Sequence, residues 1–161
     1  MPRHTWLIAL ALLAAAPAFA QVGEEPVEPY EMSNANAGAA PFSDPRLLAA
    51  FHGREGIARI VQGLLDRSFT DPRTVEIFQS HDRVRLTRTL NEQLCYILGG
   101  GCDYTGRDMK SSHKDLGLQT RDMNILVEHL REAMEEERVP NAAQNRLLSR
   151  LAPMKRDVVV R

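Results

Sequence analysis

Two cysteines and one histidine, all between residues 95 and 113, are the side chains of this sequence most suited to chemistry. Cys95 and Cys102 are the only cysteines in the chain. In an oxidising compartment an even number of thiols favours a disulfide, and two distant thiols make a poor zinc site. His113 stands in a polar segment, four residues after Met109. A neutral imidazole is a common metal ligand, so the pattern indicates a histidine whose position is fixed by a disulfide-pinned turn.

A glycine-rich turn must position these groups. Gly99, Gly100 and Gly101 follow a helical pattern, and glycine accepts the left-handed backbone angles that close a helix end. A second turn at residues 104–106 comes next, and His113 follows in a short polar stretch. A stopped helix, an irregular loop and a presented histidine suit an imidazole offered to a buried group. The residues alone do not say which group.

The rest of the folding part predicts helices and no strand. Apolar residues recur at intervals of three and four, which is typical of amphipathic helices. The expected long helices cover residues 57–69, 82–98, 120–134 and 140–158. Thr120 is the expected N-cap of the third helix, and Asn141 with Gln144 makes a capping-box pattern for the fourth. The sequence therefore predicts an all-α domain.

The first 45 residues divide into a leader and a tether. Residues 1–20 combine a basic start, the apolar run 6–16 and a small-residue end at Ala18-Phe19-Ala20, which is typical of a secretory signal peptide. An uncleaved membrane anchor is the alternative, although the apolar run is short for a bilayer span. Residues 21–45 are acidic and proline-rich, which predicts a disordered, solvated tether. The domain then covers residues 46–161, and the sequence predicts export to a bacterial periplasm.

The charge balance argues against one class of partner. The 161-residue chain has 20 Lys and Arg, 21 Asp and Glu, and a formal net charge of −1. It has no basic cluster, so the sequence gives no reason to expect nucleic-acid binding. The length fits one domain with a tail.

The central stretch resembles the group 1 truncated haemoglobins. That family's pattern has a Leu and two Gly, then Tyr-x-Gly, a Met, and a histidine nine residues after the Tyr. Here the matching residues, all at the family spacing, are Leu98, Gly99, Gly100, Tyr104, Gly106, Met109 and His113. The resemblance runs without a gap from about Leu48 to Val158. It implies a truncated globin, a two-over-two helical sandwich around a haem.

The resemblance makes His113 the proximal ligand of the haem iron. The implied cofactor is haem b, held without a covalent bond, because the chain has no C-x-x-C-H motif; covalent attachment through the cysteines is the alternative. An imidazole must be unprotonated to bind iron, so affinity should weaken at low pH. Six-coordinate family members carry a second histidine where this chain has Thr89. A five-coordinate iron is therefore expected.

The opposite, distal side of the haem departs from the best-known members. They often carry a tyrosine and a glutamine that donate hydrogen bonds to bound oxygen. The corresponding positions here are Leu65 and Leu90, and the distal position one turn before Leu90 is Leu86. Three leucines predict a dry pocket without a side-chain donor, although leucines at helical spacing are also ordinary core residues. Such a pocket predicts fast oxygen release and relatively better binding of carbon monoxide and nitric oxide.

The resemblance also implies the remaining haem contacts. Phe78 is the expected haem-packing aromatic residue, and Tyr104 has either a structural role or one at the propionate edge. Arg85 and Arg107 are candidates to pair with propionates or are solvated charges. Further lining residues are Met109, Leu118, Met123 and Val127. The other histidines of the domain, His52, His81 and His129, are expected at the surface.

The resulting expectation is a haem protein that binds diatomic gases (O2, NO, CO), in oxygen binding or transport or in NO detoxification. Any enzymatic activity would resemble that of an NO dioxygenase or a peroxidase, and a reductase would be an unidentified partner. One alternative is a periplasmic haem protein for electron transfer or sensing. Another is a haem-free helical module.

Overall fold

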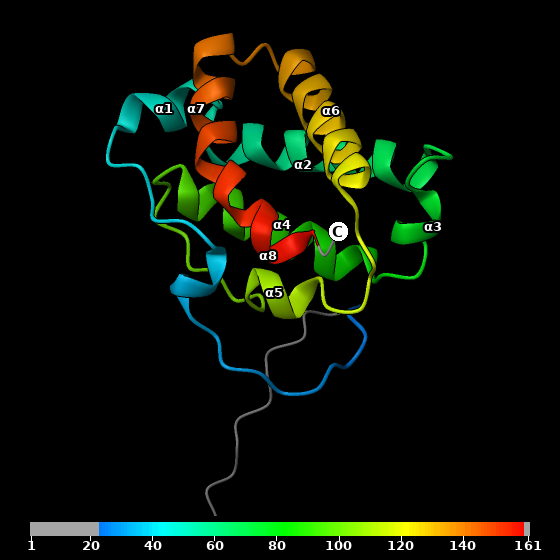
Figure 1. The fold of residues 1–161 in the computed structure, drawn as a ribbon. Helices are drawn as coiled ribbons and strands as arrows, with labels where there is room; N and C mark the ends of the chain where they lie inside the picture. Colours follow the sequence, from blue (N-terminus) through cyan, green and yellow to red (C-terminus); the bar gives the residue numbers. More distant parts are fainter. Residues whose placement is uncertain (1–22, 160–161) are drawn as a thin grey trace, which may run out of the picture.

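A computed structural model describes residues 23–159, and the signal peptide expected at residues 1–20 lies outside this range. Every regular element in the described range is helical, which confirms the all-α prediction (Figure 1). No helix within it is both long and apolar enough to cross a bilayer. The elements are η1 (Asn34–Ala37), α1 (Pro45–Ala50), α2 (Gly53–Thr70), α3 (Val75–Phe78), α4 (Arg83–Ile97), α5 (Met109–Ser112), α6 (Thr120–Glu136), α7 (Asn141–Leu151), η2 (Ala152–Met154) and α8 (Lys155–Val158).

Three of the four predicted long helices are present as single helices. The fourth, expected over residues 140–158, ends at Leu151 and is followed by the short η2 and α8, because Pro153 has no N–H to continue the hydrogen bonds of the helix. The helix starts also differ in detail. Asp82 caps α4, its carboxylate accepting hydrogen bonds from two backbone N–H groups. For α6 the N-cap is Gln119, and Thr120 is the first helical residue, so the expected cap was one residue late. The capping box expected in α7 was wrong. The Gln144 side chain is buried and donates to the Val139 carbonyl at 2.9 Å instead.

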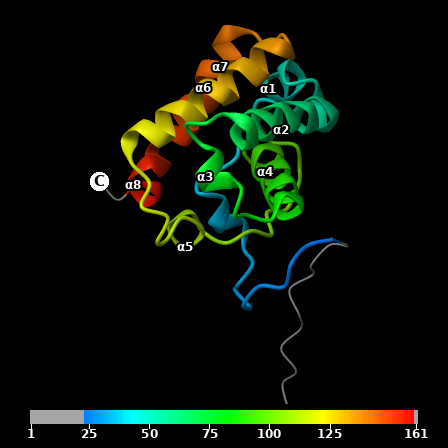
Figure 2. The ribbon, with the colours of Figure 1, turned by 90° about the vertical axis from the view of Figure 1, so that its right-hand side faces the viewer.

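Helix α2 is the centre of the packing. It packs against both α4 and α6, and α6 turns back into α7 (Figures 1 and 2). The apolar stripe of α2 is almost completely buried, with Ile60, Val61 and Leu65 at 0 % exposure. Met134 of α6 and Leu147 of α7 are equally buried. These residues form a core that the protein completes by itself.

The elements around the other end of α4 form a ring. In Figure 2, α3, α4, α5, α8 and the first turns of α6 lie around a common centre. The short helix α5 packs against α8, and η1 packs against α4. The predicted site residues of α3, α4, α5 and α6 therefore lie on elements that surround this centre.

Residues 21–45 were expected to form a solvated tether. From residue 23 on, where the structure describes it, this segment packs against the domain instead. Its 3-10 helix η1 places Ala37 in the core at 0 % exposure. The Phe42 N–H donates to the Ile97 carbonyl at 2.8 Å. The Arg150 guanidinium lies 4.0 Å from the Phe42 ring centroid. Composition alone predicts disorder because the segment is polar, but contacts with residues far along the chain supply the burial that offsets its ordering entropy.

His129 was expected at the surface and is buried, at 3 % exposure. Its Nδ1 lies 3.2 Å from Ser68 Oγ, and its Nε2 lies 3.0 Å from Asp71 Oδ2. The histidine therefore joins α6 to the end of α2. A polar ring is tolerated there because both nitrogens have partners.

Candidate functional site

His113 is half-buried at the C-terminal end of α5. Asp108 caps the N-terminal end of the same helix by accepting a hydrogen bond from the Ser111 N–H. His113 Nδ1 lies 2.7 Å from the Met109 carbonyl oxygen. A carbonyl only accepts, so Nδ1 carries the proton and donates, which leaves the lone pair of neutral imidazole on Nε2. Burial lowers the pKa of His113, opposed by the Met109 hydrogen bond, and the nearby His81 lowers it further. The ring is therefore held neutral, in the tautomer that metal-ligating histidines use.

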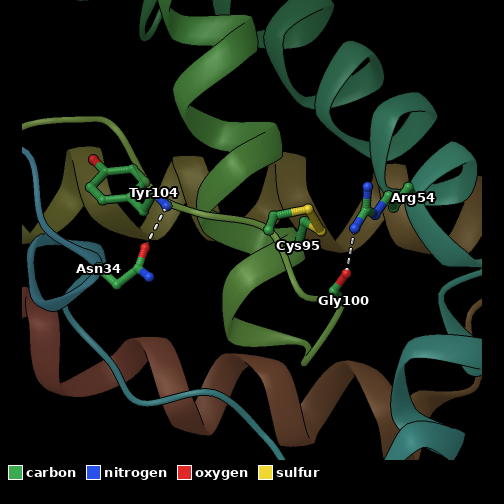
Figure 3. Close-up of a disulfide and its surroundings, with 6 residues drawn as sticks. Asn34, Arg54, Cys95, Gly100 and Tyr104 are labelled. Atoms are coloured by element: carbon green, nitrogen blue, oxygen red, sulfur yellow. Dashed lines mark hydrogen bonds between the residues drawn. A yellow bond between two sulfur atoms is a disulfide. The ribbon is translucent and has the colours of Figure 1, made fainter.

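The disulfide between Cys95 and Cys102 is formed, as predicted, with a Cα–Cα distance of 5.7 Å (Figure 3). It closes the glycine turn at the end of α4. A Cβ added at Gly100 would lie 2.7 Å from Cys95 Sγ, so the turn has no space for a side chain there. Arg54 of α2 donates to the Gly100 carbonyl at 2.8 Å. The turn is therefore tied to α2 as well as to α4.

Tyr104 has a structural role in this loop. Its backbone N–H donates to Asn34 Oδ1 at 2.7 Å (Figure 3), and its hydroxyl donates to the Arg107 carbonyl at 2.9 Å. The residue is 5 % exposed, and burial raises the pKa of its hydroxyl. A Cβ at Gly106 would lie 2.2 Å from Tyr104 Oη, which explains the Tyr-x-Gly pattern. The tyrosine thus sets the path of the chain toward α5.

A group of apolar side chains around the ring is only half-buried. These residues come from α3, α4, α6 and the segment before α6, and they are Phe78, Leu86, Leu90, Leu118, Met123 and Val127. Met109 is 9 % exposed, and Leu65 lies within the closed core at 0 %. Large apolar side chains left half-covered on several neighbouring elements fit a site that takes an apolar group. These apolar side chains, together with the one neutral imidazole nitrogen of His113, fit haem.

The described residues 23–159 hold no group of three or more His, Cys, Asp and Glu side chains placed to bind a metal ion. Thr89, at the position of the second histidine of six-coordinate relatives, donates its hydroxyl to the Arg85 carbonyl of its own helix at 2.9 Å. Leu65, Leu86 and Leu90 have no polar side-chain atoms. The predicted distal residues therefore supply no donor.

Both candidate propionate partners are held by the N-terminal segment. Arg85 lies 3.5 Å from the Glu24 carboxylate, whose side chain is 1 % exposed. Arg107 donates to the Glu28 carbonyl at 2.9 Å and lies 5.0 Å from the Tyr30 ring centroid. The structure gives both arginines a role in fixing residues 24–30.

Sequence reasoning missed Gln93. It lies on α4 and is 8 % exposed, and its amide contacts Ala37 and Met109. The signal was present, because Gln93 falls seven residues after Leu86 and three after Leu90, which places an amide on the apolar stripe of the helix.

Residues 47–160 match the protein family described as Bacterial-like globin. Group 1 truncated haemoglobin LI410 of Chlamydomonas moewusii is 33 % identical over 99 residues, which are 60 % of this chain and 56 % of that protein. The chain thus spans little more than half of that relative's length. Group 1 truncated haemoglobin GlbN of Nostoc commune is 30 % identical over 103 residues, 64 % of this chain and 87 % of that protein.

Solved structures share the fold. The Fe(III) form of truncated haemoglobin from Tetrahymena pyriformis has a TM-score of 0.67 at 22 % identity, covering 70 % of this chain and 97 % of that one. The 2/2 haemoglobin of Synechococcus sp. PCC 7002, in the cyanomet state with covalently attached haem, has a TM-score of 0.66 at 21 % identity, covering 71 % and 98 %. These neighbours confirm the two-over-two sandwich.

Proposed function

Because this chain belongs to the bacterial-like globins and is a group 1 truncated globin, we propose that it binds haem through His113 and takes a diatomic gas at the iron. The observation that carries the proposal is the 2.7 Å hydrogen bond from His113 Nδ1 to the Met109 carbonyl. This bond directs the Nε2 lone pair away from its own helix. Haem, when bound, would supply an iron that can take a diatomic gas.

We propose that the haem is haem b and is held without a thioether. Cys95 and Cys102 are joined to each other, so neither thiol is available to a vinyl group. The Synechococcus relative carries covalently attached haem, so the attachment in this chain needs its own measurement. Extraction of the haem into acidic butanone separates the two cases, because a covalent bond would keep the colour with the protein.

The proposed distal wall is Leu65, Leu86 and Leu90. A bound oxygen molecule carries partial negative charge, and one hydrogen bond to it would contribute about 1.5–3 kcal/mol. These leucines cannot donate, so we expect oxygen to leave tenfold or more faster than from a site with a donor. Carbon monoxide depends less on a donor. This pattern favours nitric oxide or carbon monoxide over oxygen storage.

We propose that the protein is exported to a bacterial periplasm. The leader pattern of residues 1–20 and the disulfide between Cys95 and Cys102 both support an oxidising compartment. N-terminal sequencing of protein recovered from a periplasmic extract tests this. A first residue of Gln21 is the expected result, and recovery only from the cytoplasmic fraction would contradict it.

The test of haem binding is the absorption spectrum of the full chain loaded with haem, in ferric, ferrous and ferrous carbon monoxide forms. We expect a strong Soret band that shifts with carbon monoxide. His113→Ala should lose or change the band, whereas His52→Ala should not, because His52 is exposed and its ring bonds to the Glu137 carbonyl. A featureless spectrum after haem addition, or an unchanged His113→Ala spectrum, would overturn the proposal.

A further inference from the structure

Gln93, which the family pattern does not use, lies at the meeting point of the N-terminal segment and the helix that ends in His113. We infer that Gln93 is a positioning residue for His113, and that it acts by joining residues 37–38 to Met109. This inference rests on the proposed role of His113 as the iron ligand. The residues involved, Ala37, Gly38, Gln93, Met109 and Met154, are called the proximal brace below.

The Gln93 amide makes two directed contacts inside the protein. Its Nε2 lies 2.9 Å from the Ala37 carbonyl oxygen and 3.3 Å from Met109 Sδ. Gln93 is 8 % exposed and Ala37 is 0 % exposed, so both contacts are shielded from water. An amide nitrogen has two hydrogens, and each has an acceptor here. The amide therefore fixes the Met109 side chain relative to a buried carbonyl of another segment.

Met109 passes this constraint to the histidine. It is the first residue of α5, and its side chain is 9 % exposed. Its carbonyl oxygen accepts the 2.7 Å hydrogen bond from His113 Nδ1. The brace thus acts on the residue that sets both the tautomer and the plane of the imidazole ring. Partners of this kind, one shell out from a metal, orient the ligand and tune its basicity.

Gly38 of the N-terminal segment lies close to Met109. Gly38 has φ +81°, and a Cβ there would lie 3.0 Å from Met109 Cγ and 3.0 Å from Met154 Cε. Met154 Sδ lies 4.0 Å from Gln93 Nε2. A side chain at residue 38 would therefore have to displace one of these methionines, and the positive φ favours glycine there.

Residues 37 and 38 lie before the family match, which begins at residue 47. The brace is therefore built in part by a segment that this chain adds to the matched globin region. The segment does more than cover the surface, because its Ala37 carbonyl is an acceptor for Gln93. We expect that loss of this segment would change the orientation of His113 and so weaken its bond to the iron.

The first experiment compares Gln93→Met with Gln144→Met in the haem-loaded chain. Methionine has nearly the length of glutamine and removes both donors. Gln144 of α7 is a matched control, since it is 1 % exposed and its side chain donates to the Val139 carbonyl at 2.9 Å. Gln93→Met should shift and broaden the iron–histidine stretching band of the ferrous protein. It should also speed haem loss to apomyoglobin by about threefold to tenfold.

Gln144→Met should lower stability without moving that band. If both variants leave the band and the haem-loss rate as in the wild type, or change them equally, the positioning role is wrong. The stability of each variant is measured by urea unfolding, so that a general loosening is distinguished from an effect on His113.

A second readout needs no haem. In the apoprotein, 15N chemical shifts of the His113 ring report which nitrogen carries the proton. We expect the Nδ1-protonated tautomer in the wild type and a mixture in Gln93→Met. If the wild type fails to bind haem, the proposed function falls, whereas this measurement still decides whether Gln93 orients His113. Unchanged ring shifts in Gln93→Met would overturn the inference.

A second pair of variants covers the case in which Gln93→Met does not fold. Gly38→Ala would push on Met109, whereas Gly53→Ala introduces a Cβ at a similar positive φ, +67°, with no atom within 4 Å. Both carry the backbone strain, and only the first disturbs the brace. A band shift in Gly38→Ala alone supports the inference, and equal behaviour of the two variants contradicts it.

Discussion

Two regions of the molecule use the same kinds of side chain and reach different degrees of burial. Around α2, the residues Ile57, Ile60 and Val61 are at most 1 % exposed. Around the ring near His113, Phe78 and Leu90 are only half-buried. The closed core is complete as a protein structure. The ring leaves apolar side chains partly exposed, which fits the proposed haem site.

Helix α4 belongs to both regions. Leu94 and Ile97, in its last turns, are 4 % and 0 % exposed, whereas Leu86 and Leu90, earlier in the same apolar stripe, are half-buried. One periodic pattern therefore runs from the closed core into the ring. Periodicity shows which face of a helix is apolar, but it does not show whether protein or ligand covers that face.

Removing haem should have the largest effect on stability of the four changes, and this effect should arise at the ring. Haem binds the folded chain, so at a free concentration a thousand times its dissociation constant it stabilises by about 4 kcal/mol. We expect a melting temperature about 10 °C lower for the apoprotein. Calorimetry of apoprotein and haem-loaded protein measures this. Equal melting temperatures would mean that the ring does not need a ligand.

Two leucine truncations compare the regions directly in the apoprotein. Leu147→Ala empties a site with 0 % exposure and should cost about 3 kcal/mol of unfolding free energy. Leu90→Ala removes a half-buried side chain and should cost about 1 kcal/mol. Urea unfolding of both variants gives the values. Similar losses would show that Leu90 is as well packed as Leu147, and would remove the difference between the regions.

The disulfide links the two regions, since Cys95 is buried at 3 % exposure and Cys102 opens the loop that leads to α5. Replacing both cysteines by serine should cost about 2–3 kcal/mol, because the closed loop no longer limits the unfolded chain. Arg54→Met, which removes the exposed tie to the Gly100 carbonyl, is the control and should cost far less. An unchanged urea midpoint in the double variant would contradict the estimate.

Lowering the pH should destabilise the folded apoprotein, and this is the smallest of the four predicted effects. Burial lowers the pKa of His113 below its ordinary value of 6.5. Below pH 6.5 the unfolded chain binds a proton that the folded chain resists, so stability falls as the pH falls toward the lowered pKa. His113→Gln should flatten this slope in the apoprotein. A slope that survives the substitution would assign the effect to another group.

The sequence predicts the helices well because their causes are local. The apolar spacing of α2 and the Asp82 cap of α4 act within a few residues. The site is predicted in part: His113 stands out only through the family pattern, and its hydrogen bond to Met109 lies within one turn. Local predictions also fail in part, because the cap expected at Thr120 lies at Gln119 and the capping box expected in α7 is absent.

The other predictions that fail concern long-range contacts. His129 is buried because Ser68 and Asp71, about sixty residues earlier, satisfy its ring. The segment before residue 45 is ordered because Gln93 and Tyr104 bind it from 56 and 70 residues away. Neither pairing leaves a mark in local composition. Polar residues on an apolar stripe, such as Gln93, are the one local sign of such partners.

The early anchoring of the chain also limits what can be attached to its N-terminus. The Glu24 carboxylate is buried against Arg88, with a 3.0 Å contact. Arg88 lies on α4, so the described chain is bonded to the body of the domain already at residue 24. Whatever is attached before Glu24 is therefore joined to the domain beside α4, with no free length of chain in between.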